Sequence, residues 1–523
     1  MQKDDSDNME EYERLFTEIT ESGSTEELPP VKDKHNSMVV IILALIFLSF
    51  CIDTLLIPFF PDVALSKGLL LTEVGVVFSA FDFARFVTAP FAGSMFSRCH
   101  PKKLFAIGTA AAGAAFISFG ITSSINSTTI FLITCIAIMC VAGMGSAMLN
   151  VSGTSLLMKA SGYESITIVA FVETGNMVGY ALGPAFGAFI YQMVGYTYMF
   201  CISGACLLIL LPVFCCILPK VENCQGYSCT CSHKHLRNFA KTAEEKSKSS
   251  SRGFLSFLTI PGLFIMFLSW VTIKLSETCR ATELTTFYHI SFGTSPASMG
   301  ILYAIWSLLS AVGIVGLTKF VNKKYAPYLL LTTWIVFIPL CVFLLPSPPV
   351  SYIFGGKRYF MLTSIIMGAL AFFASAFYIF PFSISLQLAR INGYPKNSLH
   401  TYGLLTGLMN SGLCLGSTLG PILTGVIVDN IGFELAQTLA ASITTLMAIL
   451  YGSYLLHLKC TNQLSTLFIE ENTTADTKNE SNKQKETEQI AEACSERMKL
   501  CLQEPVVYTK VQLQPDIEPT TKE

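Results

Sequence analysis

The chain has 523 residues, of which 52% are hydrophobic and only 13% are charged, about half the charged share of an average soluble domain. This balance excludes an ordinary soluble domain and predicts an all-α polytopic membrane protein. The net charge of −2 comes without a basic cluster, so we predict no nucleic-acid partner.

Residues 1–37 are acidic and polar, unlike the basic and then apolar start of a cleavable signal peptide, and we predict a disordered cytoplasmic tail there. Twelve apolar runs follow, each long enough to cross a hydrocarbon core of about 30 Å as a helix. The predicted spans are 38–60, 74–97, 104–124, 130–157, 165–191, 197–219, 254–280, 297–320, 326–346, 359–389, 398–429 and 434–457.

The loops between the predicted spans carry an uneven share of positive charge. Nine lysines and arginines follow even-numbered spans and three follow odd-numbered ones. Because positively charged loops stay in the cytoplasm, we predict cytoplasmic termini, in a vesicular or other endomembrane or in the plasma membrane. The glycosylation sequon at Asn126 would then face the lumen or the exterior.

A polar stretch divides the spans into two groups of six. We predict an N-terminal half at 38–219, a cytoplasmic linker at 220–253, a C-terminal half at 254–457 and a disordered cytoplasmic tail at 458–523. Metal binding, acylation and a plain reduced loop are open interpretations of a linker cluster formed by Cys224, Cys229, Cys231, His233 and His235. Because the spacing matches no compact zinc finger, we predict neither a metal site nor a cofactor.

Two predicted helices 237 positions apart spell nearly the same pattern, with Glu173 in the first matched by Asn410 in the second. A second match, at an offset of 225, pairs span 2 with span 8. Two matches in the right order indicate a duplicated chain. Transporters built from such halves bind substrate near the membrane midplane between them.

The glycines of this repeat recur every four residues and form a smooth stripe against which another helix can pack and slide. A proline in the same helix loosens one turn. We therefore predict packing and gating roles for Gly179, Gly183, Pro184, Gly416, Gly420 and Pro421. Ordinary tight packing is the plainer alternative.

Glu173 lies about 100° around its helix from that stripe, so it can face a central cavity. A carboxylate at the centre of a spanning helix costs on the order of 3 kcal/mol, and such residues usually mark ion or substrate paths. A helix-end residue near the headgroups is the plainer alternative. We predict that Glu173 binds protons and substrate, with Asn410 and Asn176 in the substrate cavity.

Span 7 carries charges of alternating sign at Lys274, Glu277, Arg280 and Glu283. They form either a structural ion ladder or a set of working groups, and we predict coupling roles for Glu277 and Glu283. Asp53 in span 1 is a third candidate. Asp82 and Arg85 in span 2 can pair across one turn, and we predict a structural role for them.

These acids suggest a mechanism in which a proton and a cation compete for one carboxyl group, because desolvation favours its neutral form and a nearby cation favours its charged form. Tyr303, Trp306 and Tyr378 could add cation–π contacts, although aromatic side chains at helical spacing more often serve packing. We place Tyr303 and Tyr378 in the predicted cavity.

The glycine and proline pattern of span 5 resembles the antiporter signature of the major facilitator superfamily, and Gly143, Gly145 and Ala147 resemble the end of its helix 4 signature. Ser97 and Met139 stand where that superfamily usually has charged residues. Residues 172–196, 281–285 and 416–434 resemble the vesicular amine transporters, most closely their vesicular polyamine transporter branch.

This resemblance implies export of a cation into vesicles in exchange for protons, and an acid in helix 7 that maps to Glu283. The acids that the monoamine branch has in helices 1, 10 and 11 correspond here to Ser49, Ala376 and Asn410, with Asp53 one turn from Ser49. The departure favours a polyamine or another organic cation over a monoamine or acetylcholine.

The sequence therefore predicts a secondary active transporter, monomeric, for protons and a small organic cation. A uniporter or a transporter of a neutral or anionic solute is an alternative with the same fold, and a non-transporting receptor or scaffold is another. An enzyme is not expected, because no nucleophile and base pair stands out in the spans.

Overall fold

The computed structural model describes residues 31–97, 99–161, 163–217, 254–294, 296–320, 325–344, 359–395 and 398–461. The predicted linker with its cysteine and histidine cluster, the tail from residue 462 and residues 1–30 lie outside these ranges. Helix α2 begins at Val31, so residues 31–37, which the sequence assigned to the N-terminal tail, are helical.

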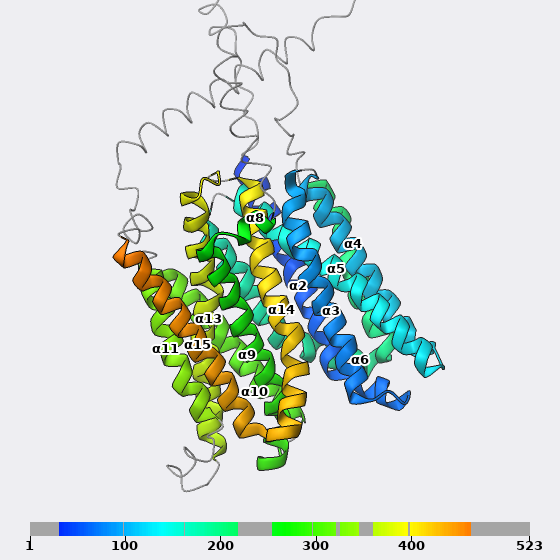
Figure 1. Ribbon diagram of the computed structural model, residues 1–523. Helices are drawn as coiled ribbons and strands as arrows, with labels where there is room; N and C mark the ends of the chain where they lie inside the picture. Colours follow the sequence, from blue (N-terminus) through cyan, green and yellow to red (C-terminus); the bar gives the residue numbers. More distant parts are fainter. Residues whose placement is uncertain are drawn as a thin grey trace, which may run out of the picture. The chain divides into compact units, whose positions relative to one another are not determined.

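The first half consists of five long helices: α2 (Val31–Ser66), α3 (Leu71–Ser94), α4 (Pro101–Ile121), α5 (Thr128–Ala160) and α6 (Ser165–Ile217). The second half consists of a short α8 (Phe254–Leu258), then α9 (Pro261–Phe292), α10 (Pro296–Phe320), α11 (Ala326–Leu344), α13 (Phe360–Ile391), α14 (Leu399–Ile431) and α15 (Phe433–Cys460). Figure 1 shows these helices side by side in one bundle.

Among the described residues, 10 helices are long and apolar enough to cross a membrane. Helices satisfy their backbone hydrogen bonds internally, which hydrocarbon requires of a lipid-exposed segment. Helix α6, 53 residues long, holds two predicted spans, because Gly195 breaks it with a φ of 79° and a ψ of 178° that favour glycine. Helix α14, 33 residues long, is not among the ten. With α14 added and α6 counted twice, the helices agree with the twelve predicted spans.

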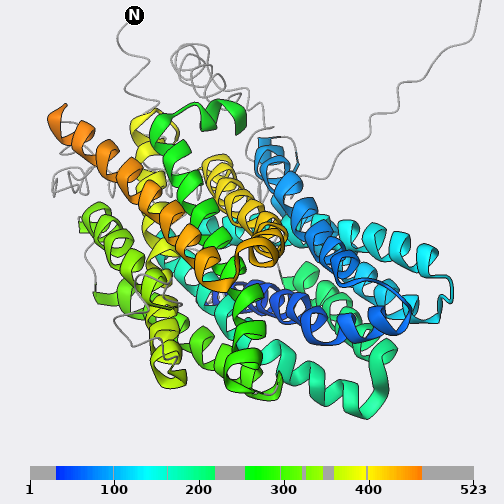
Figure 2. The ribbon, with the colours of Figure 1, turned by 60° about the horizontal axis from the view of Figure 1, so that its bottom comes forward.

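Within each half, the repeated glycines lie where helices pack closely. In the first half, α2 packs on α6, and a Cβ built on Gly183 would overlap the hydroxyl of Thr54. In the second half, α9 packs on α14, and a Cβ built on Gly420 would overlap the hydroxyl of Thr278. Figure 2 shows α2 in dark blue against the teal α6. The two halves therefore share one helix-packing arrangement.

The halves meet through two main helix pairs, α3 with α14 and α6 with α10. Figure 1 shows α14 beside α3. A Cβ built on Gly93 of α3 would overlap the carbonyl oxygen of Gly403 in α14, and one built on Gly407 would lie 2.8 Å from the carbonyl oxygen of Ala89. These contacts close the seam between the halves near the start of α14.

Candidate functional site

A polar cavity of about 50 Å³ lies between the halves. This volume has room for a few water molecules at most. Its lining comes from six helices, α2, α3, α6, α9, α13 and α14. The lining residues are Phe50, Asp82, Arg85, Glu173, Asn176, Met177, Tyr180, Lys274, Tyr378, Asn410, Leu413, Cys414 and Ser417.

On one side of the cavity, α3 supplies an ion pair whose members sit one turn apart. The Arg85 Nη1 lies 3.7 Å from the Asp82 Oδ1. The hydroxyl of Ser417 in α14 donates to the Asp82 Oδ2 at 2.7 Å, which ties the pair to the second half. The Arg85 guanidinium also lies over the rings of Phe50 and Phe81, at 5.5 and 5.4 Å from their centroids.

On the opposite side, α9 supplies a second ion pair with the same spacing. The Lys274 Nζ lies 3.2 Å from the Glu277 Oε2. The Tyr378 hydroxyl of α13 donates to that same carboxylate oxygen at 2.7 Å. Lys274 also lies over the ring of Tyr180, 5.5 Å from its centroid. Glu277 is therefore neutralised by a cation and held by a tyrosine.

Glu173 differs from both of these acids. Its exposed fraction is 7%, and its Oε2 accepts a hydrogen bond from the Asn176 Nδ2 at 3.2 Å. No Lys or Arg side chain in the described ranges lies within 4.0 Å of its carboxylate. Glu173 also lines a second, smaller cavity of about 10 Å³, whose lining includes Asn150, Thr154 and Thr406. It therefore lies where the two cavities meet.

Asp53 is another acid near the cavity without an ion pair among the described side chains. Its Oδ2 accepts a hydrogen bond from the Ser146 hydroxyl at 3.2 Å. Its Oδ1 is buried with no hydrogen-bond partner in the described part of the chain. Asp53 lies behind the cavity and does not line it.

The structure brings most of the sequence-predicted residues together. Glu173, Asn176, Tyr378 and Asn410 line one cavity, and Glu277 contacts it through Lys274 and Tyr378. Glu283 lies in α9, but its side chain lies outside the described set. The predicted roles of these residues remain predictions.

Tyr303 does not reach this cavity. Its hydroxyl donates to the Ala281 carbonyl oxygen at 2.9 Å, and its ring packs edge-on against Trp306. The predicted ion ladder of α9 also changes direction after Glu277. Arg280 is 1% exposed and lies over the ring of Phe337, 5.1 Å from its centroid. Packing therefore takes both residues away from the cavity.

The predicted packing and gating residues occupy the two seams inside the halves. Gly179 and Gly183 face α2, whereas Gly416 and Gly420 face α9. Pro184 and Pro421 lie within α6 and α14, next to Gly183 and Gly420. These four glycines therefore set the helix spacing inside each half and not the spacing between the halves.

Tyr180, Ser417 and Asn150 are among the site residues that sequence reasoning missed. Tyr180 lies two turns after Glu173 on the same face of α6, so helical spacing could have found it. Asn150 faces Glu173 from another helix, α5, and spacing along one helix carries no signal for such a contact. Arg85 was predicted to have a structural role, and Lys274 was left open between a structural ion ladder and a set of working groups, yet both line the cavity.

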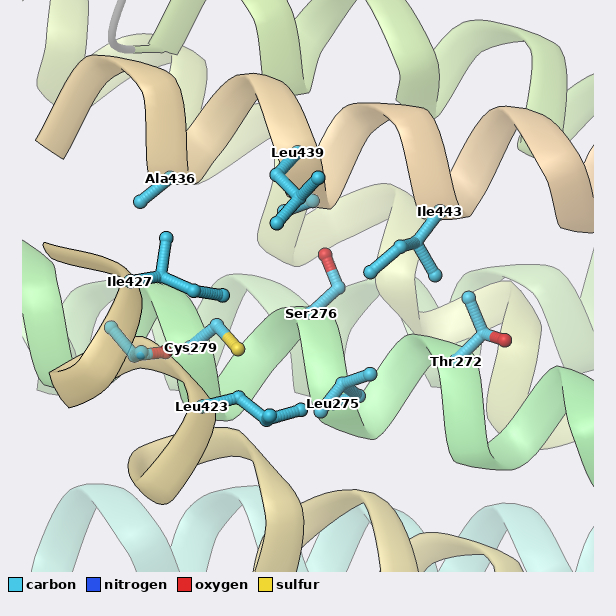
Figure 3. Close-up of a pocket in the computed structure, with 11 residues that line it drawn as sticks. Thr272, Leu275, Ser276, Cys279, Leu423, Ile427, Ala436, Leu439 and Ile443 are labelled. Atoms are coloured by element: carbon cyan, nitrogen blue, oxygen red, sulfur yellow. The ribbon is translucent and has the colours of Figure 1, made fainter. Parts of the chain in front are cut away.

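A third hollow, between α9, α14 and α15, differs from the two cavities at Glu173 in the chemistry of its lining. Figure 3 shows its lining of mainly apolar side chains, including Leu275, Leu423, Leu439 and Ile443. No charged side chain lines it. The charged cavity between the halves is therefore the candidate site.

Comparison with known proteins agrees with this architecture. Residues 42–393 match the family model described as Major Facilitator Superfamily. The chain is 26% identical to the MFS-type transporter SLC18B1 of Rattus norvegicus over 434 residues, which cover 82% of this chain and 88% of the relative. It is also 26% identical to the MFS-type transporter SLC18B1 of Homo sapiens over 436 residues, with the same two coverages.

A solved structure shows the same fold. The crystal structure of the human organic anion transporter MFSD10 (TETRAN) superposes with a TM-score of 0.60 and 15% sequence identity, over 81% of this chain and 100% of that chain. At this identity the likeness shows the fold alone.

The chain belongs to the Major Facilitator Superfamily. It is an integral multi-pass membrane protein and a transporter of small molecules, not an enzyme. The resemblance to this superfamily predicted from the sequence is confirmed, and the similarity to SLC18B1 transporters over most of the chain supports the predicted branch.

Proposed function

We propose that this transporter exchanges protons for a small organic cation, a polyamine or another amine, by alternating access. The single observation that carries the proposal is an excess of acid around the cavity. Four carboxyl groups, on Asp53, Asp82, Glu173 and Glu277, surround two basic groups, on Arg85 and Lys274. An excess of negative charge in a partly buried site is stabilised by binding protons or a cationic substrate.

The ion pairs indicate which acids carry the exchange. Asp82 and Glu277 each have a basic partner, whereas Asp53 and Glu173 have none among the described side chains. A carboxylate without a cation in a buried site favours its protonated form until a cation arrives. Glu173 lines the cavity, so an ammonium group can replace its proton there.

The closed seam provides one of the two gates that alternating access needs. At the end near the start of α14, the Ser155 and Thr406 hydroxyls lie 3.0 Å apart across the two halves. Opening this end would separate α3 and α5 from α14 and expose the Glu173 cavity. The contacts between α6 and α10, the other main helix pair across the halves, would then have to hold the halves together.

Arg85 and Lys274 raise a second possibility, an anionic substrate like that named for the structural relative. Each of these cations already has a carboxylate within 4.0 Å, however, so neither is free to bind an anion. The charge balance of the cavity therefore favours a cation. We further propose cytoplasmic termini and a monomer, in a vesicular or plasma membrane.

The test is uptake into proteoliposomes that contain the purified full chain, with an imposed pH gradient and a dye that reports the internal pH. Spermidine, serotonin and a dicarboxylate are the probes. We expect spermidine-dependent proton efflux, and we expect Glu173→Gln to abolish gradient-driven uptake while spermidine counterflow persists. The matched control is Glu73→Gln, because Glu73 caps α3 through Leu70 outside the cavity and glutamine can do the same.

Other outcomes would replace the proposal with a defined alternative. Solute flux without proton flux would indicate a uniporter. Binding without flux would indicate a receptor, and dicarboxylate flux would indicate an anion carrier. Gradient-driven spermidine uptake that is unchanged in Glu173→Gln would remove Glu173 from the mechanism.

A further inference from the structure

Asp53 and Glu173, which have no ion pair among the described side chains, lie on different helices, α2 and α6. A short line of polar side chains on α5 connects their surroundings. The Ser146 hydroxyl donates to the Asp53 Oδ2 at 3.2 Å. One turn later, the Asn150 Nδ2 donates to the Ser146 carbonyl oxygen at 2.9 Å and lies 3.4 Å from the Ser146 hydroxyl oxygen. These two residues form a polar bridge that begins at Asp53.

The other end of the polar bridge opens on Glu173. Asn150 lines the smaller cavity together with Glu173, Asn176 and Asn410. That cavity, of about 10 Å³, has the size of a single water site. Ser146 is 0% exposed and Asn150 is 2% exposed, so solvent outside the protein does not reach the polar bridge. Asp53 and Glu173 are thus joined by two side chains and one cavity.

The burial of Asn150 indicates a specific role for its amide. Burying a polar amide in an apolar helix is unfavourable unless it makes hydrogen bonds, and Asn150 is 2% exposed within the membrane-spanning helix α5. The donors of the polar bridge all point toward Asp53. Aligned hydrogen bonds of this kind polarise one another, so a change at one end alters the strength of the bond at the other.

We propose that Ser146 and Asn150 are positioning residues that couple the proton occupancy of Asp53 to that of Glu173. The inference deepens the proposed exchange, on which it rests: two protons would leave the site together when a cation with more than one charge enters. A second route for coupling is electrostatic. Arg85 and Asp82 on α3 act on Asp53, while Arg85 and the α9 charges Lys274 and Glu277 act on Glu173.

The test reads the protonation of Asp53 directly and does not depend on transport. A hydrophobic carbodiimide modifies protonated carboxyl groups, and mass spectrometry of the full chain in detergent gives Asp53 labelling as a function of pH. We expect Glu173→Gln to shift the midpoint of Asp53 labelling by roughly 0.5 to 2 pH units, the scale of coupling between residues in contact. The same substitution in an Asn150→Leu or Ser146→Ala background should shift it much less.

The matched control is Ser152→Ala. Ser152 is a buried serine of the same helix, but its hydroxyl donates to the Met148 carbonyl oxygen and does not belong to the polar bridge. In this background the full effect of Glu173→Gln should remain. The charged residues of the electrostatic route, Arg85, Asp82, Lys274 and Glu277, are present in every variant. Electrostatic coupling would therefore survive Asn150→Leu or Ser146→Ala, whereas coupling through the polar bridge would not.

Two results would overturn the inference. One is an equal effect of Glu173→Gln on Asp53 labelling with and without Asn150 and Ser146, which would assign the coupling to Arg85. The other is no effect of Glu173→Gln in the wild-type background. Failure of the proposed exchange is a separate observation, since it would appear as wild-type proteoliposomes without spermidine-dependent proton flux.

Discussion

The two halves of the molecule use one helix-packing arrangement for different chemistry. Thr54 packs on Gly183 in the first half as Thr278 packs on Gly420 in the second, and an acid precedes each threonine, Asp53 in one and Glu277 in the other. The second-half acid has Lys274 and the Tyr378 hydroxyl as partners. Among the described side chains, the first-half acid has a serine hydroxyl as its hydrogen-bond partner and no ion pair.

The duplicated helix shows the same division. Glu173 in α6 is a carboxylate that lines the cavity, whereas its counterpart Asn410 in α14 donates its amide to the Thr406 carbonyl oxygen at 2.9 Å. Among the described residues near the cavity, the first half thus holds two acids without cations beside the Asp82–Arg85 pair, and the second half holds a neutralised pair and an amide. A duplicated scaffold can assign titration to one half and substrate positioning to the other.

The largest expected effect comes from moving the carboxylate to the other half. We expect the double variant Glu173→Gln with Asn410→Glu to show no gradient-driven spermidine uptake. Asn176, which donates to Glu173, corresponds in the second half to Leu413, which cannot donate. Proteoliposome uptake measures the result, with Glu73→Gln as the control. Restored coupling in the double variant would show that the halves are interchangeable.

A second prediction separates the two matched acids by stability. Lys274→Met leaves the partly buried Glu277, whose side chain is 23% exposed, without its cation and should destabilise the protein by about 1 to 3 kcal/mol, whereas Lys274→Met with Glu277→Gln should recover most of this loss. Asp53→Asn should change stability little, because Asp53 has no ion pair among the described side chains. Thermal unfolding in detergent compares the variants. Similar losses for Lys274→Met and Asp53→Asn would remove the contrast.

A third prediction tests whether the helix packing is shared. Gly183→Ala and Gly420→Ala would each force a methyl group into a threonine of the neighbouring helix, so each should cost about 1 to 3 kcal/mol. Gly175 has no atom within 4 Å of an added Cβ. Gly175→Ala should therefore be neutral or stabilise α6 by up to about 1 kcal/mol. Thermal unfolding of the three variants measures this, and a loss confined to one half would show that the seams differ.

The smallest effect concerns the hydroxyl that holds Glu277. Tyr378→Phe removes the hydrogen bond at 2.7 Å, which should raise the KM for spermidine by roughly 3- to 10-fold, equivalent to about 1 kcal/mol. Tyr288→Phe is the control, since the Tyr288 hydroxyl pairs with Ser364 and does not line the cavity. An unchanged KM in Tyr378→Phe would place Glu277 outside the binding step.

Much of the site could be predicted from single helices. Glu173 and Asn176 follow from helical spacing and from the cost of a carboxylate in a membrane span. Tyr303 was a wrong choice for this cavity, because its place depends on Trp306 and on the Ala281 carbonyl oxygen of another helix. The sequence pattern of α10 alone does not show which of its faces α9 and α13 cover.

The sequence by itself determined the class of fold, since hydrocarbon admits long apolar segments only as helices with internal hydrogen bonds, and the repeat fixed which helices match. Both ion pairs lie within single helices, three residues apart. Only the tertiary structure decided which hydroxyl groups of other helices bind these acids. Asp82 bonds to Ser417 and Glu277 to Tyr378, partners 335 and 101 positions away. Glu173 has no Lys or Arg partner within 4.0 Å among the described side chains. Contacts between helices depend on distances that are set by packing, and no local pattern encodes these distances.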